Sequence, residues 1–146
     1  MVGLVGCEVA AKTAIPAKKL CKKLVHKKCL AFSRLECAHI FLISPLYGLL
    51  SLEEPVTPMD KTRTCKGDQH TLAIQVVRDL ISSMRVRVGT SPFQVILLSN
   101  GAFGTYVCQE CKWNGIPVCW PVKDMSNREQ VRVLSMHIRA KKATNT

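Results

Sequence analysis

The sequence predicts an α/β protein with a mostly parallel central sheet of about four strands and helices on both faces. Two observations support this fold. Short, continuous apolar runs occur at residues 2–7, 39–43, 93–98 and 116–121, which is typical of strands buried on both faces. Amphipathic segments alternate with these runs, as expected where helices connect parallel strands. A length of 146 residues favours a single domain.

Four helices are predicted from apolar residues that recur every three or four positions. They cover residues 17–32, 69–84, 102–113 and 127–140. Asp68 is a candidate N-cap for the second helix, and Asn114-Gly115 is a typical end for the third. We expect the domain to span residues 1–140, with 141–146 as a basic, flexible tail.

The charge balance favours a polyanionic partner. The chain carries 21 basic and 10 acidic residues, a net charge of +11, which attracts DNA, RNA or nucleotide phosphates. Four lysines would share one face of the helix predicted at 17–32, although a plain solvated surface is the alternative reading. The candidate nucleic-acid contacts are Lys19, Lys22, Lys23, Lys27, Arg63, Lys66, Arg128 and Arg132.

The loops at the carboxyl ends of the strands should converge and form the ligand site. They cover residues 7–12, 44–48, 99–106 and 121–126. The candidate ligand-binding residues there are Cys7, Lys12, Ser44, Gly48, Gly101 and Tyr106. Lys12 would contact a phosphate. Plainer roles remain open, with the glycines serving turns and Cys7 filling the core.

A catalytic reading of the same loops is also open. Asp60 or Glu54 would be the acid, Tyr47 the aromatic platform and Asn100 the donor to a departing base. The alternatives are that Tyr47 is a packed tyrosine with its hydroxyl bonded to backbone, and that Asn100 is only an N-cap.

Eight cysteines without a signal peptide indicate free thiols that pack as small hydrophobes. Cys108, Cys111 and Cys119 leave a zinc site open, completed by His137 or Cys65. We predict no metal, because Cys108 and Cys111 both lie on a predicted helix and the sequence has no second close pair of cysteines. We also predict no cofactor, since the chain has neither a P-loop nor a dinucleotide fingerprint. No apolar run approaches the roughly 20 residues of a membrane span, so we expect a cytoplasmic protein without a membrane partner.

Several segments resemble the YaaA-like superfamily. A loop of the small phage and prokaryotic domains in this superfamily is matched by Ser44, Tyr47, Gly48, Leu49, Leu50, Pro58 and Asp60. In this chain Met59 stands where those domains usually have an aromatic residue. Cys7 and Lys12, Ser99-Asn100-Gly101 with Tyr106, and residues 115–118 with Pro121 are similar to further family segments in the same order. The resemblance implies a fold similar to that of uracil-DNA glycosylases, and a link to DNA or its bases.

Three functional hypotheses follow. The first, slightly favoured, is a non-catalytic module that binds DNA or a nucleotide. The second is an N-glycosidase that releases a base from modified DNA or from a nucleotide. The third is a nucleotide-binding protein that a phage uses in counter-defence.

Overall fold

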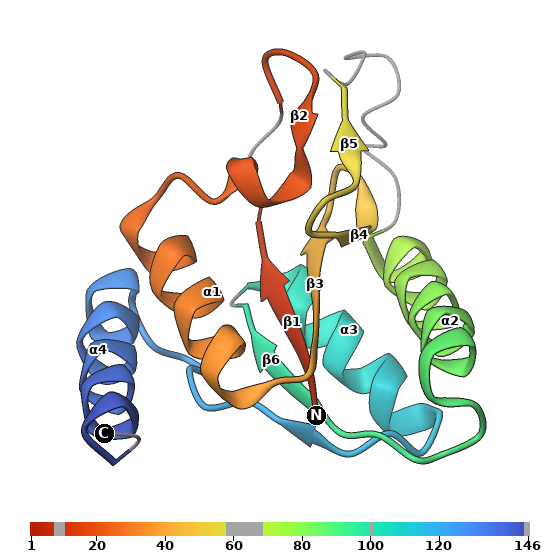
Figure 1. Ribbon diagram of the computed structural model, residues 1–146. Helices are drawn as coiled ribbons and strands as arrows, with labels where there is room; N and C mark the ends of the chain where they lie inside the picture. The colour runs from red at the N-terminus through yellow and green to blue at the C-terminus, as the bar shows by residue number, and fades with distance from the viewer. Residues whose placement is uncertain (8–10, 58–68, 100, 145–146) are drawn as a thin grey trace.

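The computed structural model describes residues 1–7, 11–57, 69–99 and 101–144, and Figure 1 shows its elements. The α-helices in these ranges are α1 (Leu24–Glu36), α2 (Gln69–Val88), α3 (Ala102–Trp113) and α4 (Asn127–Thr144). A short 3-10 helix, η1, covers Ala17–Leu20. The strands are β1 (Val2–Gly6), β2 (Ile15–Pro16), β3 (His39–Ser44), β4 (Gly48–Ser51), β5 (Pro55–Val56), β6 (Val95–Leu98) and β7 (Val118–Cys119).

The central sheet has the strand order β4-β3-β1-β6-β7. β1 pairs in parallel with both β3 and β6, and β6 pairs in parallel with β7. Among the described strands of this sheet, only β4, at one edge, runs antiparallel to its neighbour β3. β2 and β5 form a separate two-stranded antiparallel sheet. The prediction of an α/β fold with a mostly parallel sheet is therefore confirmed, with five strands in place of about four.

The extra strand, β4, begins at the last residue of the loop predicted at 44–48 and continues to Ser51. Gly48 follows a tight reversal after Ser44 and has a φ of +78°, which a glycine adopts without a steric penalty. The three residues after it then pair with β3 in an antiparallel hairpin. Leu49 and Leu50 thus extend the sheet by one edge strand and also pack against the two core clusters.

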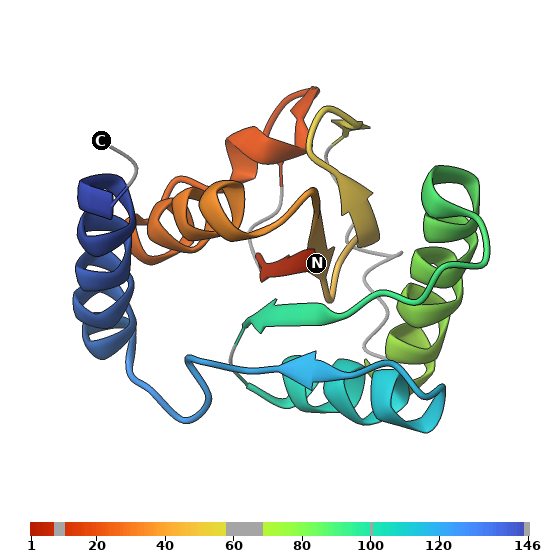
Figure 2. The ribbon, with the colours of Figure 1, turned by 60° about the horizontal axis from the view of Figure 1, so that its bottom comes forward.

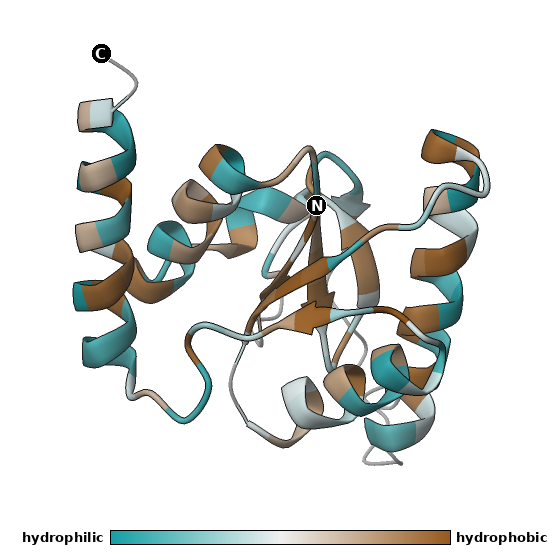
Figure 3. Ribbon diagram, turned by 90° about the horizontal axis from the view of Figure 1, so that it is seen from below, coloured by the Kyte–Doolittle hydropathy of each residue, from teal (hydrophilic) through white to brown (hydrophobic). Residues whose placement is uncertain are grey.

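The strand side chains divide between two core clusters. Leu4 and Leu97 join a cluster that contains α2 and α3 residues such as Leu80, whereas Val5 and Leu98 join one that contains α1 and α4 residues such as Leu134. Successive side chains of a strand point to opposite faces, so neighbouring residues reach different clusters. Figure 2 shows α1 beside α4 and α2 beside α3, and Figure 3 shows the strands between them as mostly hydrophobic.

The helix predicted at 17–32 is interrupted. η1 ends at Leu20, and α1 begins only at Leu24 because Lys23 has an extended backbone (φ −69°, ψ 147°). Lys19, Lys22 and Lys23 therefore do not lie with Lys27 on one helical face, and the predicted lysine stripe is wrong in this form. At the other end of the chain, α4 continues to Thr144, beyond the predicted end at residue 140.

Candidate functional site

The strand order places a topological switch point at the end of β1. After β1 the chain passes through α1 to β3 on one side, whereas β6 lies on the other side of β1 and leads through α3 to β7. The two connections therefore leave the sheet in opposite directions beside Gly6 and Leu98. Open α/β sheets bind ligands in the crevice that such a divergence creates.

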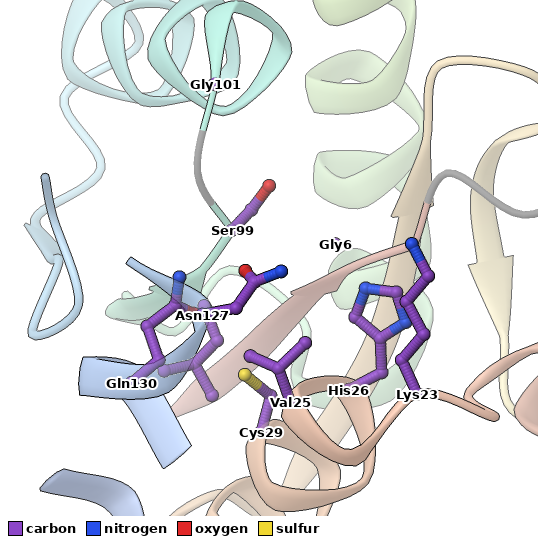
Figure 4. A pocket seen from close by; sticks show the side chains of 10 residues that line it. Gly6, Lys23, Val25, His26, Cys29, Ser99, Gly101, Asn127 and Gln130 are labelled. Atoms are coloured by element: carbon purple, nitrogen blue, oxygen red, sulfur yellow. The ribbon is translucent and has the colours of Figure 1, made fainter. Parts of the chain in front are cut away.

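A cavity of about 320 Å³ lies at this point, and we call it the switch-point pocket. Figure 4 shows its side chains: Lys23 and His26 at the start of α1 lie on one side, and Asn127 and Gln130 of α4 on another. The strand ends and the start of α3 complete the wall. Its lining residues are Gly6, Lys23, Val25, His26, Cys29, Leu98, Ser99, Gly101, Asn127 and Gln130, and none of them is acidic.

Three helices begin at the switch-point pocket. Lys23 and Gly101 are the N-cap residues of α1 and α3, and Asn127 is the first residue of α4. Neither α1 nor α3 has an acidic residue in its first turn or a side-chain hydrogen bond at its N-cap. The partial positive charge of these two helix ends is therefore left without a negative side chain of their own.

The third helix start differs, because its own residues cap it. The Ser126 hydroxyl accepts a hydrogen bond from the Glu129 amide and donates one to the Glu129 carboxylate, both at 3.2 Å. This reciprocal arrangement is close to a capping box. In the same helix the side-chain amide of Gln130 donates a hydrogen bond to the Met125 carbonyl oxygen at 3.1 Å. This bond fixes the buried Gln130 side chain beside the pocket.

The floor of the pocket depends on close packing at the ends of β1 and β6. A Cβ atom on Gly6 would lie 2.3 Å from the Ser99 hydroxyl oxygen and 2.6 Å from the Ser99 Cβ. A Cβ on Gly104 would lie 3.2 Å from the same hydroxyl oxygen. The Trp120 indole donates to the Ser99 carbonyl oxygen at 2.7 Å. Two glycines and a tryptophan thus hold Ser99 in place at the pocket.

Of the residues predicted from sequence, the structure brings Lys23 and Gly101 together in this pocket. Ser44, Tyr47 and Gly48 instead build the β3–β4 hairpin. The Ser44 hydroxyl is buried and accepts hydrogen bonds from the amides of Leu46 (3.0 Å) and Tyr47 (3.1 Å). These contacts stabilise the turn, and none of the three residues lines the switch-point pocket.

The Tyr47 hydroxyl has a bridging role. It accepts a hydrogen bond from the Ala11 amide at 2.9 Å and donates one to the Thr57 carbonyl oxygen at 2.8 Å. Its ring packs against the cluster that contains α1 and α4. These contacts match the plainer alternative considered for Tyr47, a packed tyrosine bonded to backbone.

The remaining loop candidates lie apart from the pocket lining. The Cys7 thiol is buried and donates to the Leu20 carbonyl oxygen at 3.6 Å. Tyr106 packs edge-on against His70, with ring centroids 5.4 Å apart, between α3 and α2. Lys12 and Glu54 are exposed. Four further candidates, and the proposed cap Asp68, lie outside the described residues: Asp60, Arg63, Lys66 and Asn100.

The described cysteines are free thiols, mostly in the core. Burial raises the pKa of Cys29 and of Cys111 to about 12. A hydrogen bond with Cys7, together with burial, raises the pKa of Cys21. Within residues 1–7, 11–57, 69–99 and 101–144, no three histidine, cysteine or acidic side chains are placed to hold a metal ion. Cys108 and Cys111 are buried whereas Cys119 is exposed, and Cys65 lies outside these ranges.

The candidate nucleic-acid contacts within the described ranges are exposed, and none of them takes part in an ion pair there. In the described part of the chain, the ion pairs join Lys18 to Glu53 (2.6 Å) and Lys141 to Glu36 (3.7 Å). Neither pair includes any of the candidate nucleic-acid contacts. The exposed candidates are Lys19, Lys22, Lys23, Lys27, Arg128 and Arg132.

No family model, curated protein or solved structure matches this chain. The resemblance to the YaaA-like superfamily therefore stays a prediction. None of the described helices combines the length and apolar character that a membrane span requires.

Several features of the pocket were missed from sequence. They are the lining residues His26, Cys29, Asn127 and Gln130, and the close packing of Gly6 against Ser99. The one sequence signal for them is position, because each lies at a strand end or in the first turns of a helix. That signal is usable only once the strand order reveals which strand ends and helix starts are neighbours.

Proposed function

We propose that this chain binds the phosphate group of a nucleotide or nucleic acid in the switch-point pocket, without catalysing a reaction on it. The observation that carries the proposal is the pocket itself. Three helices begin there, Lys23 lies at its rim, and no carboxylate is among the lining residues that the structure describes. Helix N-termini with free amide groups are common phosphate sites, since N–H donors and the helix dipole both favour an anion.

The rest of the lining suits the remainder of a nucleotide. Val25 and Leu98 supply apolar surface, and the Asn127 amide can donate to and accept from a base edge or a sugar hydroxyl. A volume of about 320 Å³ is at the lower end of the range for small-molecule pockets. The two core clusters also support the expected placement of helices on both faces of the sheet. With that placement, the helix starts lie at the carboxyl ends of the strands.

The non-catalytic form of the hypothesis is favoured over the N-glycosidase. A glycosidase needs an acid or a polarised water beside the sugar. The described residues offer no carboxylate in the pocket lining, and Tyr47, the proposed platform, is not among the described lining residues. Its hydroxyl is hydrogen-bonded to the backbone of Ala11 and Thr57.

Replacing Lys23 by glutamine tests the proposal. A hydrogen bond to a charged group contributes about 1.5–3 kcal/mol, so Lys23→Gln should weaken binding of a nucleoside 5′-monophosphate about tenfold or more. Lys112→Gln, which removes an equal charge from the exposed last turn of α3, should leave binding unchanged. Isothermal titration calorimetry of both variants and of the unaltered chain measures the effect. If both variants lost the same amount of affinity, the nucleotide would be attracted by the basic surface in general and not bound in the pocket.

A further inference from the structure

A second hollow adjoins the switch-point pocket. It has a volume of about 320 Å³ and lies between the first turns of α1 and α4. We call it the α1–α4 groove. It shares Lys23, Val25 and Asn127 with the switch-point pocket, so the two hollows have a common wall. Its lining residues are Lys23, Leu24, Val25, Asn127, Arg128 and Val131. A ligand seated in the pocket thus has an exit along this groove.

The two helices that form the groove are parallel. Near their middle, the rings of Phe32 and His137 contact each other edge-on, with centroids 6.0 Å apart. Near their ends, Lys141 pairs with Glu36 at 3.7 Å. Because these partners follow in the same order along both helices, the N-termini of α1 and α4 lie at the same end, at the groove. Both helices therefore direct the positive ends of their dipoles toward it.

Basic side chains follow the groove on both helices. Lys23, the N-cap residue of α1, and Arg128 of α4 line the groove. Lys27 follows in the first turn of α1, and Arg132 comes four residues after Arg128, a spacing that puts the two arginines on one side of α4. None of the four is in an ion pair within the described part of the chain. The nearby Glu129 carboxylate accepts a hydrogen bond from Ser126 as part of the cap of α4.

The groove also has an apolar component. Val25 and Val131 contribute to its lining, and Leu24 at its edge keeps 60% of its surface exposed. A row of cations beside exposed apolar surface suits a single strand, because a single strand offers both phosphates and unpaired base faces. A duplex offers its phosphates but keeps its bases stacked inside.

We propose that the ligand of the switch-point pocket is one nucleotide of a single-stranded polynucleotide, and that the strand continues along the α1–α4 groove with its phosphates beside Arg128 and Arg132. The inference rests on the proposed function of the pocket and extends it to a substrate class. DNA and RNA share the phosphodiester chemistry that the groove recognises, so the test includes both.

The test compares two pairs of substitutions that remove the same charge. Arg128→Gln with Arg132→Gln alters the groove, and Arg78→Gln with Arg85→Gln alters exposed positions of α2. Fluorescence anisotropy measures the binding of single-stranded DNA and RNA decamers over a range of salt concentrations. The groove variant should bind decamers about tenfold more weakly and lose roughly 1.4 from its logarithmic salt slope, about 0.7 for each phosphate contact. Its affinity for a nucleoside 5′-monophosphate should not change, whereas the α2 variant should match the unaltered chain.

Two results separate failure of this inference from failure of the proposed function. If the unaltered chain binds no nucleoside monophosphate, the pocket proposal is wrong. If monophosphate binds but both pairs of substitutions weaken decamer binding equally, or duplex DNA binds as tightly as either decamer, the groove inference is wrong and the pocket proposal stands.

Discussion

Gly6→Ala is expected to lower the free energy of unfolding by about 1–3 kcal/mol, the usual cost of overpacking a well-packed site. The new Cβ would lie 2.6 Å from the Ser99 Cβ and 3.3 Å from the Ser99 Cα. No rotation of the Ser99 side chain moves either of these atoms, so β1 and β6 must separate where they line the pocket. We therefore expect this variant also to lose nucleotide binding.

A second substitution makes the Gly6→Ala prediction specific. Ser99→Gly removes the Cβ and hydroxyl that meet the new methyl group, leaving the 3.3 Å contact with the Cα. The double variant should regain most of the lost stability, which a double-mutant cycle from urea unfolding measures as a coupling energy. Additive effects of the two substitutions would contradict the packing described for Gly6 and Ser99.

Alkaline pH is expected to destabilise the fold through its buried thiols. Burial raises the pKa of Cys29 and of Cys111 from the ordinary value of 9.0 to about 12 in the folded chain. A raised pKa in the folded state contributes stability that is complete below about pH 9 and is lost as the pH rises towards 12. Each thiol should cost roughly 1.4 kcal/mol for each pH unit in this window, because the unfolded chain ionises first.

Cys29→Ala and Cys111→Ala test this pH dependence. Each leaves a cavity and lowers the stability at neutral pH, so the informative quantity is the slope of the unfolding free energy between pH 9 and 11. Each substitution should make that slope shallower. Cys119→Ala is the matched control, because Cys119 is exposed. If all three variants kept the slope of the unaltered chain, the buried thiols would not be its cause.

The fold class was predictable because it depends on local patterns. Leu4 and Val5 lie in an apolar run that reads as a strand buried on both faces, and the two residues do enter opposite core clusters. The end of α3 was predictable too, since Asn114 is its C-cap and Gly115 has a φ of +74°. The β3–β4 hairpin was missed, because an apolar segment that contains Gly48 reads equally well as a turn or as an edge strand.

The pocket was less predictable, because it depends on strand order. All loops at the carboxyl ends of the strands were candidates for the ligand site, and the loop with Tyr47 carried the most distinctive residues. Only the position of β1 between β3 and β6 shows that the connections from β1 and from β6 run in opposite directions, so that the ligand crevice lies at the ends of these two strands. Lys23 was predicted as a phosphate contact on a continuous helix. It reaches the pocket because the chain is extended there and α1 begins one residue later.

The most direct test of the phosphate site is to locate the ligand on the chain. Nitrogen-15 NMR spectra recorded with a nucleoside 5′-monophosphate, and separately with the matching nucleoside, report on each backbone amide. We expect the monophosphate to shift the amides of residues 24–26 and 101–104, at the starts of α1 and α3, and the nucleoside to shift them far less. Equal shifts from both ligands, or shifts centred on the β3–β4 hairpin instead, would contradict a phosphate site in the switch-point pocket.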